Sequence, residues 1–101
     1  MSGITVGTAE NGLSVSLPTF SAVSIFRTYH VIAFVDRNGV TTSGERDVTG
    51  TTLRNGVSVS VPGSFQKGDD INLHVQVREI NAPEILFDER IRGCKVGPAS
   101  T

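Results

Sequence analysis

The chain has 101 residues, of which 38% are hydrophobic and 19% are charged, and its formal net charge is -1. This length leaves room for one domain with one core, and the composition is too apolar for a disordered tail. Nine basic residues are spread among ten acidic ones without a block. The chain therefore lacks the basic stripe that neutralises several phosphates, and we expect no nucleic-acid partner.

Nothing in the sequence is typical of a targeting segment or a membrane span. Residues 1–5 have no basic stretch followed by an apolar one, which a secretion signal requires. The longest apolar run, 31–35, is far shorter than the roughly 20 residues of a spanning helix. The single cysteine, Cys94, excludes an intramolecular disulfide. We expect an intracellular protein without a membrane span, with assembly into a virion or export without a signal as open alternatives.

Apolar and polar residues alternate along most of the chain, and no segment keeps the helical spacing of apolar residues. The clearest case is 71–78, where every second residue is Ile, Leu or Val and those between are polar. Such a strand has one buried and one solvated face. We expect an all-β domain with eight strands, at 4–8, 12–17, 28–36, 40–48, 48–53, 56–61, 70–79 and 84–92.

The dipeptide Asn-Gly occurs three times beside strand-like segments, at 11–12, 38–39 and 55–56. Both residues tolerate the positive φ angles of tight hairpin turns, so the sequence predicts three hairpins. The last nine residues are rich in Gly, Pro and Ser. We therefore expect a single domain over 1–93 followed by a flexible tail over 94–101.

Two segments 44 residues apart are nearly identical. Residues 11–18 read NGLSVSLP and residues 55–62 read NGVSVSVP, which agree at six of eight positions. This favours an internal duplication of about 44 residues, although alternating Val and Ser after a turn can also arise independently. Eight short strands with these turns predict an antiparallel β-sandwich of Greek-key or jelly-roll type, and a small barrel is the alternative.

The two halves differ on one strand face. The outward residues of 70–79 are polar, whereas the matching positions of 28–36 include Ile32 and Phe34. The apolar segment 19–27 either covers these two side chains or leaves them exposed. An exposed apolar patch of this kind usually marks an interface.

No catalytic, metal or phosphate motif is present. His30 and His74 occupy matching positions, but two imidazoles are too few for a closed zinc site. Residues 36–39 begin like a calcium loop and lack the rest of it, so they indicate a hairpin turn. The serines lack a Gly-x-Ser-x-Gly elbow. We expect neither enzymatic activity nor a cofactor nor a bound metal.

Two functions fit a small β domain that acts through its surface. The favoured hypothesis is a self-associating structural subunit, a homo-oligomer whose contact uses Ile32, Phe34 and an exposed strand edge. The alternative is a module that binds a glycan or a protein partner. The absence of Trp and the single Tyr weaken this alternative. Its candidate residues lie in loops and on the polar strand face: Asp36, Arg37, Asn38, Glu45, Arg46, Asp47, His74, Gln76 and Arg78.

Overall fold

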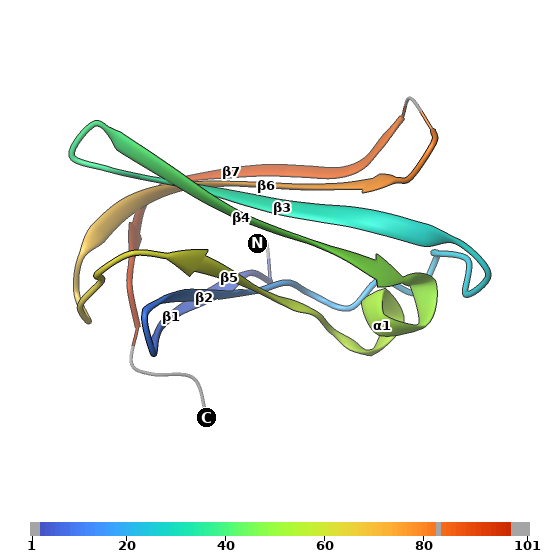
Figure 1. Cartoon of the computed structure of the whole chain (residues 1–101), viewed down its shortest axis with the longest axis horizontal. Helices are drawn as coiled ribbons and strands as arrows, with labels where there is room; N and C mark the ends of the chain where they lie inside the picture. Colours follow the sequence, from blue (N-terminus) through green and yellow to red (C-terminus); the bar gives the residue numbers. More distant parts are fainter. Residues whose placement is uncertain (1–2, 83, 98–101) are drawn as a thin grey trace.

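The computed structural model describes residues 3–82 and 84–97, and most of them lie in two layers of antiparallel strands (Figure 1). The expected all-β architecture is confirmed. A short helix, α1 (Gly50–Asn55), connects the layers. The three-stranded sheet has the order β1 (Thr5–Ala9), β2 (Gly12–Ser16), β5 (Ser58–Pro62). The four-stranded sheet has the order β4 (Val40–Thr49), β3 (Thr28–Arg37), β6 (Asp70–Glu79), β7 (Ile85–Lys95).

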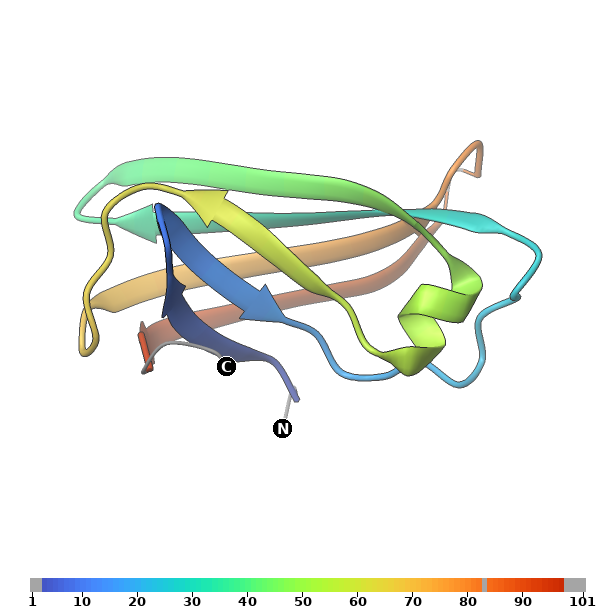
Figure 2. The ribbon, with the colours of Figure 1, turned by 60° about the horizontal axis from the view of Figure 1, so that its bottom comes forward.

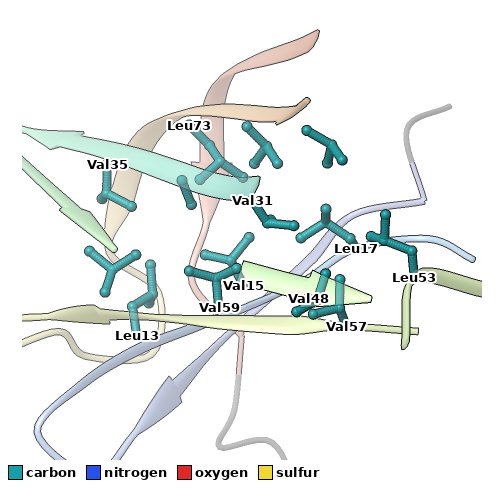
Figure 3. Close-up of a cluster of buried hydrophobic side chains, with 14 of the residues drawn as sticks. Leu13, Val15, Leu17, Val31, Val35, Val48, Leu53, Val57, Val59 and Leu73 are labelled. Carbon is teal, nitrogen blue, oxygen red and sulfur yellow. The ribbon is translucent and has the colours of Figure 1, made fainter. Parts of the chain in front are cut away.

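The hydrophobic core lies between the two sheets, where the alternating apolar side chains of both layers meet (Figure 3). The four apolar residues of β6 that the alternation singles out are at most 2% exposed. On the facing sheet, Leu13 and Val15 of β2 pack with Val59 and Val61 of β5. Each such side chain contributes about 1.5–3 kcal/mol when it leaves water. No polar or charged residue is buried within the described part of the chain.

One expected strand is a helix. β4 continues to Thr49, and residues 50–55 form α1, so the strand expected at 48–53 is wrong and the described residues contain seven strands. The hydroxyl of Thr49 accepts a hydrogen bond from the Thr52 backbone N–H at 3.3 Å and caps the helix. Gly56, with φ 107°, ends it. The third Asn-Gly pair is therefore a helix terminus and not a hairpin turn.

The other two Asn-Gly pairs lie at hairpins, as expected. Asn38 and Gly39 connect β3 to β4 with φ angles of 55° and 81°, the two positive values that a type I′ turn requires. In the first hairpin the positive φ belongs to Asn11, while Gly12 already pairs in β2. Gly12 is needed for a different reason: a Cβ there would lie 2.3 Å from the Val61 carbonyl oxygen.

The sandwich extends beyond the expected domain boundary at residue 93. Cys94 and Lys95 belong to β7, Val96 is 2% exposed, and the Gly97 N–H donates to the Val6 carbonyl at 2.9 Å. This bond brings Gly97 beside β1, and the segment after β7 can be followed to that strand in Figure 2. Burial raises the pKa of the Cys94 thiol, which lowers its reactivity. Residues 98–101 of the expected tail lie outside the described residues.

Residues separated by 44 positions face each other in both sheets. Val15 pairs with Val59 between β2 and β5, and Ile32 pairs with Gln76 between β3 and β6. The segment that would match β1 is occupied by α1. The internal duplication and the Greek-key or jelly-roll assignment stay predictions.

Candidate functional site

The four-stranded sheet has one face against the core and one face toward solvent, which we call the outer face. In Figure 1 it is the upper surface, and no other described segment lies over it. Strand pairing arranges its side chains in rows across β4, β3 and β6. These rows are Asp47-His30-Arg78, Glu45-Ile32-Gln76, Ser43-Phe34-His74 and Thr41-Asp36-Asn72.

The segment 19–27 does not cover the outer face. It connects β2 to β3 and passes beside α1 at one end of the molecule (Figures 1 and 2). Val23 is buried in the core there, and Gly50 lets the chain pass close to Ser24, because a Cβ would lie 1.8 Å from the Ser24 carbonyl oxygen. Ile32 and Phe34 therefore lie open to solvent on one side, at the centre of the outer face.

Neighbouring side chains on the same sheet shield these two apolar residues in part. Both Ile32 and Phe34 are half-buried. The Phe34 ring stacks on the His74 imidazole, with ring centroids 5.7 Å apart and an angle of 30° between the planes. The centre of the outer face therefore offers apolar and aromatic surface framed by polar groups, which is the composition of an interaction surface.

Each histidine on the outer face is held by carboxylates of an edge strand. His30 contacts Asp47 through Nδ1 at 2.7 Å and Glu45 through Nε2 at 3.1 Å. The His74 Nε2 lies 2.6 Å from Asp88 Oδ1. In residues 3–82 and 84–97, no group of three or more His, Cys, Asp or Glu side chains could hold a metal ion. These contacts fix the orientation of the imidazole rings.

Charge is distributed unevenly across the outer face. The β4 side carries the acidic residues Glu45 and Asp47. The opposite side carries Arg78 on β6 and Arg90 and Arg92 on β7. None of these three guanidinium groups has an ion-pair partner among the described residues. One lateral half of the face is therefore acidic, and the other is basic on balance, with three arginines and the single carboxylate of Asp88.

A pocket of about 270 Å³ opens at the end of the outer face nearest the β3–β4 turn. Side chains from all four strands line it, among them Phe34, Asp36, Asn72, His74, Arg90 and Arg92. The Oδ1 atom of Asp36 is buried and has no hydrogen-bond partner within the described part of the protein. The Asn72 Oδ1 accepts from the Gly93 N–H at 3.1 Å.

Three residues of the predicted ligand set lie away from the outer face. The Arg37 guanidinium donates to the Ser64 carbonyl at 2.7 Å and to Asp69 at 2.9 Å, and it lies 4.6 Å from the Phe65 ring centroid. Asn38 forms the turn. Arg46 donates to the Ser58 carbonyl of β5 at 3.0 Å. Of the other six, five share the outer face with Ile32 and Phe34, and Asp36 lines its pocket.

Sequence reasoning missed Asp88, Arg90 and Arg92 as site residues, although Phe87 and Ile91 alternate with them in part of the last strand. The pairing of β6 with β7 contains register shifts between Ile71 and Leu73 and between Val77 and Arg78. Between these shifts residues 87–91 pair regularly with β6, but Glu89 occupies a position opposite Val75 and Leu86 is exposed. The sequence of this strand therefore shows no clear alternation that would assign the arginines to the same face as His74.

The contact between Arg37 and Asp69 predicts an acid-sensitive element of stability. The Gln66 backbone N–H, bonded to Asp69 at 2.9 Å, lowers the pKa of this carboxyl below its ordinary value of 3.8, and Arg37 lowers the pKa further. A carboxyl whose pKa is lowered by folding stabilises the fold above its unfolded pKa, and this contribution disappears as the pH falls through the folded value.

We therefore expect wild-type protein to lose more stability than the Asp69→Asn variant between about pH 5 and about pH 2, as measured by urea unfolding at each pH. Asp70→Asn is the matched control, because Asp70 has an exposed ion pair with Lys95 at 2.6 Å. Equal acid losses in wild type and Asp69→Asn would contradict the prediction.

Comparisons with known proteins gave no match: no family model, no curated protein and no solved structure is significantly similar to the chain. No helix in the described part of the chain is long and apolar enough to cross a membrane.

Proposed function

We propose that the domain is a non-enzymatic subunit that self-associates through the outer face of its four-stranded sheet. The observation that carries this proposal is the position of Ile32 and Phe34 between an acidic and a basic half of one open face. A twofold axis parallel to the strands would place β4 of one copy over β7 of the other. By strand pairing, Glu45 would then lie over the row that contains Asp88, and Arg90 would lie one row further along the strands, about 7 Å away and within reach of its long side chain, twice in the same dimer.

The size of the outer face supports a dimer of modest affinity. Its strands have 10 or 11 residues. With strands about 4.8 Å apart and a rise of about 3.3 Å per residue, the face measures about 19 by 33 Å. Two such faces would bury about 1,200 Å² in total, the lower limit for stable interfaces. We expect the association to depend on protein concentration.

The strand edges favour contact through the face over edge-to-edge pairing. β4 and β7 are the two edges of the four-stranded sheet. β4 lies close to β5 of the other layer, and β7 carries charged residues and two register shifts, which discourage strand addition. β1 is bridged by Gly97, and the Arg46 side chain covers the Ser58 carbonyl of β5. The strand edge that the sequence hypothesis included is therefore not part of this proposal.

The test is the solution mass by light scattering between about 10 μM and about 1 mM, a range that brackets weak dimers. Wild type should shift from monomer to dimer, whereas Phe34→Asp should stay monomeric because a carboxylate replaces the apolar centre. Thr51→Asp, an exposed change on α1, is the control and should behave as wild type. A monomeric wild type at every concentration overturns the proposal.

Charge exchange tests the orientation of the dimer. The variant Glu45→Arg, Asp47→Arg and the variant Arg90→Glu, Arg92→Glu should each fail to self-associate, because the β4 and β7 edges that meet would then carry net charge of the same sign. A mixture of the two should restore a dimer, since the new positive charges on β4 of one variant would lie beside the new negative charges on β7 of the other. Failure of the mixture, with both variants folded, would contradict the proposed twofold axis.

A further inference from the structure

We propose that the pocket at the end of the outer face binds an acidic saccharide, namely a sugar ring that carries a carboxylate. This goes beyond self-association, which does not require a small ligand. The pocket volume of about 270 Å³ lies near the lower limit of ligand pockets. That size suits a single ring.

Asp36 supplies a hydrogen-bond acceptor at one wall of the pocket. Its Oδ1 atom is buried and has no partner in residues 3–82 and 84–97, so a ligand hydroxyl would donate to the other oxygen of the same carboxylate. A metal ion fits poorly, because Arg90 and Arg92 line the same pocket and the Asn72 Oδ1 is already used by the Gly93 N–H.

The opposite wall of the pocket favours an anion. Arg90 and Arg92 lie on β7, and neither has an ion-pair partner among the described side chains. Guanidinium groups bind carboxylates through paired N–H donors. With its oxygen engaged, Asn72 has its amide N–H groups left to donate. A ligand that carries a negative charge on the side away from Asp36 would therefore pair with these arginines.

The ring of Phe34, stacked on His74, supplies the third element of recognition. Aromatic surface packs against the C–H face of a sugar ring, while the hydroxyls at the ring edge remain free for hydrogen bonds. A simple anion would not use the Asp36 carboxylate, and a neutral sugar would not use the arginines. A sugar acid satisfies all three groups at once.

The experiment is a titration of the full chain followed by amide ¹H–¹⁵N NMR, with glucuronate, glucose and acetate as separate probes at matched ionic strength. We expect glucuronate to shift the signals of residues around the pocket with a Kd of about 1–10 mM, as for a weak single-ring ligand. Glucose and acetate should each bind at least about 10-fold more weakly, which corresponds to losing one group of contacts.

Two variants assign the binding to the pocket. Asp36→Leu should weaken glucuronate binding at least about 10-fold, because the hydroxyl acceptor is lost. If Asp36→Leu fails to fold, the variant Arg90→Gln tests the site instead. It should remove the preference for glucuronate over glucose. Asp47→Asn is the control: like Asp36→Leu it removes one carboxylate charge from the outer face, but Asp47 does not line the pocket. This variant should bind glucuronate like wild type.

Glucuronate binding can be tested independently of self-association. The titration is repeated with Glu45→Arg, Asp47→Arg, which should be monomeric and which leaves the pocket residues unchanged. Binding to this variant supports the saccharide site whether or not wild type dimerises. Acetate or glucose binding as tightly as glucuronate, or no shift by glucuronate up to about 50 mM, a concentration well above the expected Kd, overturns the proposal.

Discussion

Replacing Gly44 by alanine is expected to destabilise the fold by more than about 3 kcal/mol, which is among the larger losses for a single substitution. Gly44 lies on β4, where the four-stranded sheet approaches β5 of the other layer. A Cβ on this residue would lie 1.9 Å from the Ser60 carbonyl oxygen and 3.2 Å from the Val61 Cα. Both neighbours are backbone atoms, so no rotamer change relieves the clash and the two layers must separate.

Urea unfolding followed by circular dichroism measures this loss as a lower midpoint. Ser43→Ala is the matched control, because Ser43 precedes Gly44 on the same strand and is exposed on the outer face. Its stability should stay within about 0.5 kcal/mol of wild type. A Gly44→Ala variant as stable as Ser43→Ala would show that β4 and β5 do not approach this closely in solution.

The strands that the sequence predicts best are those in which one face is buried along the whole length. In β6 every second residue is buried and those between are exposed or half-buried, so the period of two is visible directly. β4 lacks this signal, because its middle positions carry Gly44 and Arg46 where other strands carry Val or Leu. The position of β4 is predicted from its neighbour instead, because the Asn38-Gly39 turn and the clear alternation of β3 fix where a paired strand must run.

Helix α1 shows where local sequence is a poor guide. Two consecutive threonines and a short apolar-polar pattern favour a strand in isolation. The outcome is decided by a hydrogen bond from Thr52 to the Thr49 hydroxyl, by Gly56 at the helix end and by the burial of Leu53. The first two are visible in the sequence as capping signals, but the third depends on the tertiary structure.

The candidate site was predictable where strand alternation holds. Ile32 and Phe34 follow from the parity of β3, and His74 and Gln76 from that of β6. The same alternation explains why Arg37 does not lie on the outer face. Arg37 continues the series of every second residue that points inward, namely Tyr29, Val31, Ala33 and Val35. Treating residues 36–38 together as one loop overlooked this signal. The pocket, in contrast, depends on the curvature and register of β7, which no local pattern encodes.

Replacing Leu53 by alanine is expected to cost about 3 kcal/mol, within the range measured for buried leucines. Leu53 is completely buried and is the one large apolar side chain that α1 contributes to the described core. The backbone bond from the Phe20 N–H to the Leu53 carbonyl, at 3.2 Å, is unaffected by the substitution. The loss would therefore report the missing side chain and the cavity that it leaves.

Thr51→Ala is the control for Leu53→Ala, since Thr51 is exposed on the same helix and alanine favours helix formation. Urea unfolding should give Thr51→Ala a midpoint close to wild type and Leu53→Ala a clearly lower one. A helix of six residues is too short to be stable by itself, so tertiary contact must hold it in place. A loss below about 1 kcal/mol for Leu53→Ala would mean that the connection between β4 and β5 does not depend on packing of the helix against the core.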